Sequence, residues 1–189
     1  MAHAWKACYP QGFVGSNPTP SEMKKTKFTL TLKDKPMVEL VKKTDKKILA
    51  VWAIDCALRV LPYFEEKYPK DLRPRHALET LQAWINTGVF KMAVIRKASL
   101  DSHAAARDVG EDNAARSAAR ACGQAVATAH VRTHSLGSAL YAQQAIFRAT
   151  KLSKANLAVA KERDWQYKHL LALIGSYDNV ANLVKKPKL

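Results

Sequence analysis

An alanine-rich run in the second half of the chain limits the possible folds more than any other feature. Residues 111–130 read EDNAARSAARACGQAVATAH, in which small side chains fill most of the interior and acidic residues come first. Acidic side chains suit the positive end of the dipole at the start of a helix. So many small residues also let neighbouring helices approach closely. The run therefore predicts a long helix inside a tightly packed bundle.

The rest of the chain also shows helical patterns, because glycine and proline fall between its apolar segments. Pro74 suits the first turn of a helix, whereas Pro62 should kink or end the helix that contains it. Gly88, Gly110 and Gly175 should each end a helix. The expected helices cover residues 37–43, 46–67, 75–87, 90–109, 111–136, 138–150 and 153–174. We therefore predict an all-α fold, a compact bundle of about six helices with an alanine-rich core.

The two ends of the chain differ from its middle and lead us to expect four regions. Residues 14–19, VGSNPT, can be encoded by codons that form the complementary arms and loop of the T-arm of a tRNA gene. We therefore expect the true start at Met23, with an ordinary disordered tail as the alternative. The segment FTLTL alternates like a strand but has no second strand to pair with, so we expect an extended arm. The expected regions are a disordered tail at 1–22, a lysine-rich leader arm at 23–45, a helical domain at 46–175 and a basic tail at 176–189.

The chain carries a large positive charge that gathers toward its ends. The formal net charge is +15 over 189 residues, with nine lysines from Lys24 to Lys47 and further lysines at the carboxyl end. Such lysine-rich ends attract polyanions, including nucleic acid, an acidic protein or anionic lipid. A solvated surface that keeps the protein in solution is the alternative. No RNP-like strand, zinc-finger spacing or zipper accompanies the charge.

The composition indicates one folded domain inside the cell. Hydrophobic residues make up 48% and charged residues 25%, which is typical of a globular protein. No apolar run is long enough to span a membrane, and the first residues lack a secretory signal. Cys8, Cys56 and Cys122 lie far apart without a CxxC motif, which favours free thiols in a reducing cytoplasm. We therefore expect a cytoplasmic protein that does not associate with a membrane.

The segment AHVRTH places two histidines, His130 and His134, four residues apart. This spacing puts both imidazoles on one face of a helix and is found in zinc sites. The segment lacks the glutamate of HExxH, no third ligand lies nearby, and Arg132 would repel a metal ion. We therefore expect no metal site. The histidines either line a pocket with one of the tryptophans or connect helices by hydrogen bonds near a bend, which we expect around Gly137.

Two groups of charged residues accompany the first strongly apolar helix. Asp55 and Arg59 are the only charges in WAIDCALRVL, and their spacing makes an ion pair within the helix sterically natural. The alternatives are a clamp to a neighbouring helix and a polar floor to a pocket. In DLRPR, Arg73 and Arg75 flank Pro74 at a helix start, a place that suits an anion or a carboxylate. The alternative is that these arginines bind local carbonyl groups or Asp55.

No motif of a known catalytic mechanism occurs in the sequence. There is no GxSxG, P-loop or GxGxxG segment. Asp55 could act with Glu65 or Glu79 as an acid and a base, but the sequence does not show that these carboxylates converge. We therefore expect no catalytic residue and no cofactor.

Several long segments resemble a bacterial family of immunity proteins, the immunity-protein-five-like group. The segment WAIDCALRVLPYFEEKYPKDLRPRHALETLQAW is similar to the opening of that family's domain. SHAAAR, AARACGQAVATAHVRTHSLGSALYA and ERDWQYKHL are similar to its later segments, so the resemblance covers residues 50–174. The chain departs from the family at Arg59, where an acidic or polar residue is expected, and at Arg132, where proline is common. The polar residues that match the family and that we expect to form a binding site are Asp55, Arg73, Arg75, His103, Arg107, His130 and His134.

The resemblance implies an α-helical protein that binds and neutralises a cognate toxin of a polymorphic toxin system without catalysis. Many such proteins are acidic because their toxins are basic nucleases, so a charge of +15 points away from a basic nuclease as the partner. The residue chemistry offers an alternative, a small enzyme or ligand-binding protein whose pocket combines Asp55, the arginines and the histidines. A second alternative is a nucleic-acid-associated protein that uses its lysine-rich ends.

Overall fold

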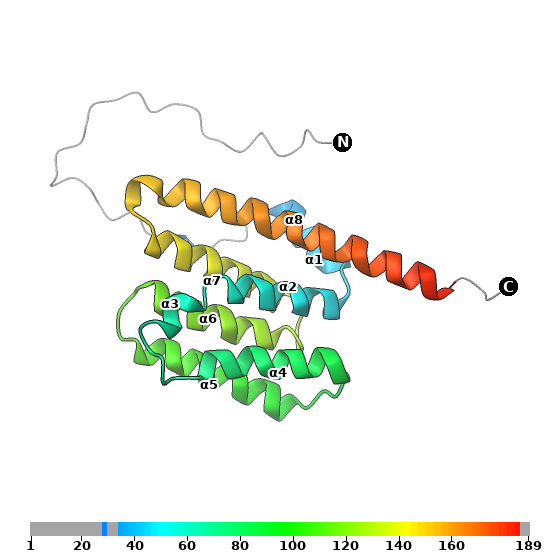
Figure 1. The fold of residues 1–189 in the computed structure, drawn as a ribbon, viewed down its shortest axis with the longest axis horizontal. Coiled ribbons are helices and arrows are strands. Elements are labelled where there is room, and N and C mark those ends of the chain that lie inside the picture. Colours follow the sequence, from blue (N-terminus) through cyan, green and yellow to red (C-terminus); the bar gives the residue numbers. More distant parts are fainter. Residues whose placement is uncertain (1–27, 30–33, 186–189) are drawn as a thin grey trace, which may run out of the picture.

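Eight helices make up the described part of the chain, which comprises residues 28–29 and 34–185 of this computed structural model (Figure 1). In chain order they are α1 (Lys35–Lys43), α2 (Lys46–Leu58), α3 (Pro62–Glu65), α4 (Arg73–Thr87), α5 (Met92–Asp108), α6 (Ala114–Ala127), α7 (His134–Ala149) and α8 (Leu152–Lys185). No strand occurs within these residues. The all-α prediction is therefore confirmed, although the helices outnumber the expected six.

The alanine-rich helix α6 lies in the middle of the bundle, as its small side chains predict (Figure 1). It packs against α2, α3, α4, α5 and α7. Hydroxyl groups of α5 reach its backbone, since Ser99 donates to the Gly123 carbonyl oxygen at 2.9 Å and Ser102 donates to that of Ala119 at 2.8 Å. The buried residues of α6 are Ala115, Ser117, Ala118, Ala119, Ala121, Cys122, Gly123, Ala125 and Val126.

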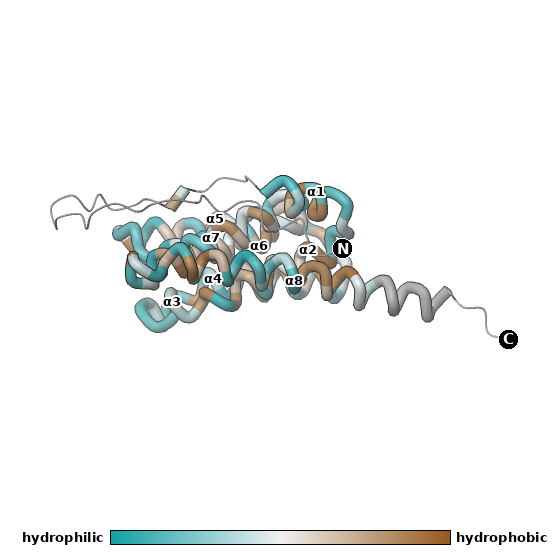
Figure 2. Tube along the Cα trace, turned by 90° about the horizontal axis from the view of Figure 1, so that it is seen from above, coloured by the Kyte–Doolittle hydropathy of each residue, from teal (hydrophilic) through white to brown (hydrophobic). Residues whose placement is uncertain are grey.

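The long helix α8 covers one side of the bundle and packs on α2 and α7. Hydrophilic and hydrophobic stretches alternate along it (Figure 2). Glu162, Gln166 and Leu170 are buried at a spacing of four residues, whereas Lys161 and Lys168 are exposed, so one stripe of this helix faces the bundle. Within the described residues, none of the helices has the length and apolar character needed to cross a membrane.

A proline divides the expected helix over residues 46–67 into α2 and α3. Pro62 occupies the first turn of α3, where the missing amide N–H costs nothing. The prediction that this proline ends or kinks the helix is confirmed. Pro74 likewise lies in the first turn of α4. Gly88 and Gly110 follow α4 and α5 with φ angles of 70° and 72°, which confirms both predicted helix ends.

The break between α6 and α7 lies in AHVRTH itself and not at Gly137, so that prediction was wrong. α6 ends just before this segment, and α7 begins at His134. The Ser135 hydroxyl donates to the Arg132 carbonyl oxygen at 2.7 Å, a local bond that competes with a continuous helix. The β-branched residues of the segment also favour a helix less than alanine does. His130 and His134 therefore do not share one helical face.

α8 continues through Gly175 to Lys185, so the prediction that it ends at this glycine was wrong. A single glycine costs a helix about 1 kcal/mol, which the packed turns before it can offset. Part of the expected basic tail, residues 176–185, is therefore helical. Residues 1–22, most of FTLTL and the last residues, 186–189, are expected regions that lie outside the described residues.

The short first helix begins two residues earlier than predicted because Asp34 caps it. The Asp34 carboxylate accepts a hydrogen bond from the Met37 amide at 3.2 Å, and Pro36 lies in the first turn. Met37 is buried, so this part of the expected leader arm packs on the bundle. Nearby in the chain, the ring of Phe28 lies 5.5 Å from that of Phe147, measured between centroids.

Two glycines inside helices predict opposite effects of substitution by alanine. A Cβ atom at Gly175 would meet nothing within 4 Å, whereas one at Gly123 would lie 2.8–3.0 Å from three atoms of the His103 ring. Gly175→Ala should raise the free energy of unfolding by up to about 1 kcal/mol, because alanine favours the helix. At Gly123 the overpacking should outweigh this gain and lower the free energy by about 1 kcal/mol. Urea unfolding of both variants measures the difference, and a stabilised Gly123→Ala would contradict the close packing of α5 on α6.

Candidate functional site

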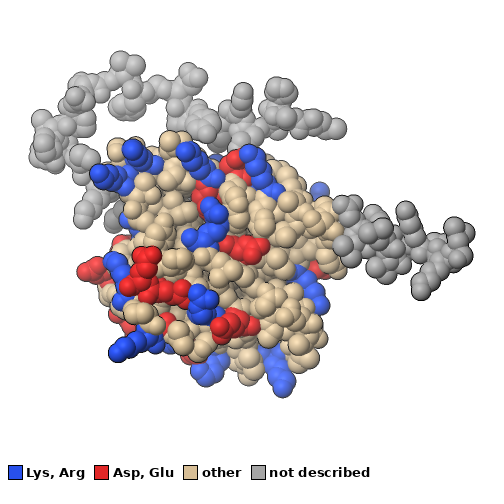
Figure 3. All heavy atoms as spheres, in the orientation of Figure 1, with Lys and Arg blue, Asp and Glu red and all other residues tan. Residues whose placement is uncertain are grey.

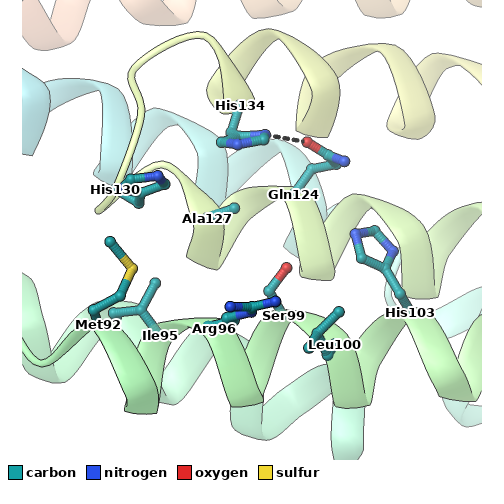
Figure 4. Close-up of a pocket in the computed structure, with 10 residues that line it drawn as sticks. All are labelled: Met92, Ile95, Arg96, Ser99, Leu100, His103, Gln124, Ala127, His130 and His134. Carbon is teal, nitrogen blue, oxygen red and sulfur yellow. Dashed lines mark hydrogen bonds between the residues drawn. The ribbon is translucent and has the colours of Figure 1, made fainter.

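The AHVRTH turn closes one end of a cavity between α5 and α6. The cavity has a volume of about 400 Å³. In Figure 4, α5 forms one wall, while α6, the turn and the start of α7 form the other. The lining residues are Met92, Ile95, Arg96, Ser99, Leu100, His103, Gln124, Ala127, His130 and His134. All three histidines of the predicted binding site therefore line one cavity.

A hydrogen bond between His134 and Gln124 fixes one side of this cavity (Figure 4). The His134 Nδ1 atom lies 2.8 Å from the Gln124 Oε1 atom. Because an amide oxygen only accepts, Nδ1 carries the proton and Nε2 is left as an acceptor. A Cβ atom at Gly137 would lie 2.7 Å from the same oxygen, so glycine makes room for this bond. Burial lowers the pKa of His134, and the neighbouring His130 adds to the effect.

His103 lines the same cavity from α5 as a half-buried imidazole. Its Nδ1 atom is buried and has no hydrogen-bond partner among the described residues. Burial, together with the positive charges of Arg120 and Arg107, lowers the pKa of His103 to about 4. The ring is therefore neutral at pH 7. Arg107 itself, which we predicted as a binding residue, is exposed and does not line the cavity.

A second polar group joins α2 to α8, and none of its residues lines the cavity. The Asp55 carboxylate lies 2.7 Å from the Nε2 atom of His169. The His169 ring stacks on Trp165 with centroids 4.8 Å apart. The guanidinium of Arg59 also lies over the Trp165 ring, with its Cζ atom 3.9 Å from the ring centroid. Asp55 is thus a clamp between two helices, which was one of the alternatives for this residue.

Arg59 completes this group through a buried carboxylate on α8. Its Nη2 atom lies 2.9 Å from the Oε2 atom of Glu162, whose side chain is only 2% exposed. Glu162 also accepts a hydrogen bond from the Gln166 amide at 3.0 Å. The main-chain carbonyl oxygen of Gln166 accepts a hydrogen bond from the indole N–H of Trp52 at 2.8 Å. Asp55 and Arg59 do not pair with each other within the helix, because each of these residues pairs with α8 instead.

The two arginines of DLRPR hold the start of α4 through carboxylates. Arg73 lies 2.6 Å from Asp71 and 2.7 Å from Asp108, and Arg75 lies 2.6 Å from Glu65. The hydrogen bonds to these carboxylates raise the pKa of both arginines above its ordinary value. The same contact with Arg73 lowers the pKa of Asp71. Both arginines are therefore engaged by acids of this chain, which disfavours the predicted anion site at the helix start.

The seven predicted binding residues thus lie in several places and not in one pocket. The histidines line the cavity, Asp55 faces α8, the arginines of α4 bind its flanking acids, and Arg107 is exposed. The alternative in which Asp55 and the arginines share a pocket with the histidines is therefore disfavoured. The reason is that α6 and α7 carry the two histidines of AHVRTH toward α5, whereas α8 covers α2.

The partners of Asp55 and Arg59 were not predicted from the sequence. They all lie in ERDWQYKHL, at Glu162, Trp165 and His169. Their spacing of three and four residues places them on one face of a helix and was the available signal. Polar residues on a helix stripe that faces the bundle need hydrogen-bond partners, and the two charged residues of α2 supply them.

The described residues offer little for metal binding or nucleophilic catalysis. They contain no group of three or more His, Cys, Asp or Glu side chains that could hold a metal ion. Cys56 and Cys122 are buried free thiols, and burial raises the pKa of both. A protonated thiol is a poor nucleophile. Asp55 and Glu65, considered as an acid and a base, are each held by a different partner.

Charges of both signs lie side by side on the face of the molecule in Figure 3. Acidic side chains gather on this face in the region of α3. In this part of the chain, Glu65 at the end of α3 pairs with Arg75, and Asp71 pairs with Arg73. The positive charge therefore forms no single basic patch on this face.

A comparison with protein families gives a match over most of the chain. A profile described as Imm-5 like putative immunity protein matches residues 39–173. The matched range includes the residues that line the cavity and the two ion pairs between α2 and α8, Asp55 with His169 and Arg59 with Glu162. No curated protein and no solved structure matches the chain.

Removing Arg59 should destabilise the bundle, because the buried carboxylate of Glu162 would lose its ionic partner. Water can replace part of this interaction at the 42% exposed arginine. We therefore expect Arg59→Ala to lower the free energy of unfolding by about 2 kcal/mol, measured in urea. Adding Glu162→Gln should recover part of this loss, since the amide carries no charge. Lys161→Ala, at an exposed neighbour on α8, is the control, and strictly additive losses would contradict a coupled pair.

Acid should weaken the fold through His103. The unfolded imidazole has a pKa of about 6.5, and the folded one has a pKa of about 4. Between these values the unfolded chain binds the proton first, so stability is full above the upper value and falls as the pH drops toward the lower one. His103→Gln should make unfolding in urea less dependent on pH in this window. His76→Gln, at an exposed histidine, should leave the dependence unchanged, and equal slopes in both variants would argue against a neutral His103.

Proposed function

The chain belongs to the Imm-5 like putative immunity protein family, and on that premise we propose that it binds and neutralises a cognate protein toxin without catalysing a reaction. The observation that carries the proposal is the family match over residues 39–173, which includes every helix from α2 to α7 and most of α8. An immunity protein acts by occupying its toxin. This role needs a stable surface and no reactive group.

The internal pairing of polar residues supports a binding role. The acids and arginines that stand out in the sequence hold helices to one another, as Asp55 does with His169 and Arg59 does with Glu162. Such contacts keep the bundle in one conformation before it meets a partner. A preorganised surface loses less conformational entropy on binding than a flexible one.

The charge and the cysteines indicate the kind of partner and compartment. A net charge of +15 favours a toxin with an acidic surface, since opposite charges speed association and exclude wrong partners. Cys56 and Cys122 are buried as free thiols, which fits a reducing cytoplasm. We infer that the protein acts there on a toxin of a polymorphic toxin system.

The domains of the proteins encoded by the neighbouring genes provide the test. Each purified domain is titrated with the full chain by calorimetry, and growth of cells that express it is measured with and without the chain. We expect one domain to bind and its toxicity to be lost. The association rate should fall by roughly tenfold or more between low and high salt, because charge steers the encounter. A basic helical protein of unrelated sequence is the control, and failure of every neighbouring domain to bind would refute the proposal.

The cavity between α5 and α6 favours a second candidate function, the binding of a small ligand. Its volume of about 400 Å³ lies in the range of small-molecule sites. Its lining contains the three histidines and neither Asp55 nor the arginines of α4. A ligand-binding role would therefore rest on this cavity alone.

A further inference from the structure

We propose that the cavity between α5 and α6 binds a small carboxylate whose remaining body is compact and apolar. The proposal goes beyond toxin binding and does not depend on it. Three properties of the lining support it, namely apolar walls, an arginine without a balancing acid, and imidazoles that add polar contacts without charge.

The apolar walls set the body of the ligand. Met92, Ile95 and Leu100 line the cavity from α5, and Ala127 lines it from α6. Figure 4 shows these side chains on both sides of the space that the histidines border. A volume of about 400 Å³ holds a body of the size of one aromatic ring with a short side chain. Burial of such a body removes apolar surface of both partners from water.

Arg96 gives the lining a positive charge, and no carboxylate lines the cavity with it. No hydrogen bond or ion pair joins Arg96 to another residue in the described part of the chain. Its neighbours Lys97 and Asp101 pair with each other at 2.6 Å and lie outside the lining. A guanidinium presents paired N–H donors that match the two oxygens of a carboxylate.

The histidines provide polar contacts that need a partner. The His134 N–H is already held by Gln124. His103 has no such partner, and its Nδ1 atom is sealed inside the protein, so Nε2 is the nitrogen that a ligand can reach. Burial and nearby arginines lower the pKa of His103 to about 4, which keeps one N–H on a neutral ring at pH 7. A carboxylate that accepts from this N–H and from Arg96 would be bound at two points.

Other ligand classes fit this lining less well. A cation would meet Arg96 in the lining and the positive charges of Arg107 and Arg120 close to His103. A phosphate is usually held by several cationic or N–H donors, whereas this lining is mostly apolar. A neutral apolar molecule would cover the His103 ring without giving it a hydrogen-bond partner and would make no use of the charge on Arg96.

Phenylacetate and phenylacetamide test the proposal, because they share the same body and differ in the terminal group, which is a charged carboxylate in one and a neutral amide in the other. Each is titrated into the full chain by calorimetry, and the histidine ring signals are followed by NMR. We expect phenylacetate to bind with a Kd of about 1 mM or tighter. The amide should bind roughly tenfold more weakly or worse, since a hydrogen bond to a charged group is lost. The signals of His103 and His134 should shift, whereas that of the exposed His76 should not.

Arg96→Gln and Lys97→Gln form the matched pair of variants. Both remove one positive charge from exposed positions of α5, but only Arg96 lines the cavity. Arg96→Gln should weaken phenylacetate binding by about tenfold or more and weaken the amide much less, because the amide carries no charge. Lys97→Gln should leave both affinities unchanged. Ala127→Leu, which narrows the cavity, should weaken both probes, and thermal unfolding shows whether each variant keeps its fold.

Three results would overturn the proposal. The first is equal affinity of the full chain for the acid and the amide. The second is an equal loss of acid binding in Arg96→Gln and Lys97→Gln, which would indicate a general effect of charge. The third is the absence of phenylacetate binding at about 10 mM, a concentration well above the Kd expected for a ligand of this size. None of these results bears on toxin binding, so the two proposals fail separately.

Discussion

The close contact between α5 and α6 is the constraint on which the rest of the structure depends. The hydroxyls of Ser99 and Ser102 reach carbonyl oxygens of α6 at Gly123 and Ala119, which is possible only when two backbones lie close together. Small side chains on α6 permit this approach. The same approach brings the His103 ring to within 2.8–3.0 Å of the place where a Cβ atom on Gly123 would lie. Toward the end of α6 the chain turns away, and the space between the two helices becomes the cavity.

Most of the fold could be predicted because its signals are local. The prolines and glycines between the helices act through their own backbone angles, and most helix ends were correct to within a few residues. The errors lie where a longer-range or competing contact decides. Gly175 does not end α8, which continues through this residue to Lys185. The break in AHVRTH depends on the Ser135 hydroxyl and on contacts that place His134 opposite Gln124, which no periodicity reveals.

The candidate site was less predictable, because grouping depends on which helices meet. His169 is 114 residues away from Asp55, and Glu162 is 103 residues away from Arg59. The charged pair on α2 was recognised as unusual, yet a partner on the same helix, on α4 or on α8 would have suited its chemistry equally. The sequence therefore identified residues that need partners, and only the packing of α8 on α2 assigned them. The same holds for the histidines, whose shared cavity requires the chain to turn between α6 and α7.

The place of these residues also bears on how an immunity protein of this kind could choose its partner. The segments that resemble the family supply the partly buried pairs of Asp55 with His169 and of His134 with Gln124. Contacts of this kind stabilise the bundle and are largely hidden from a toxin. A shared scaffold can then present different exposed residues without losing its fold, because surface substitutions usually change stability little. On this view the family segments maintain the bundle, and specificity for a toxin resides in exposed side chains, including the many basic ones of this chain.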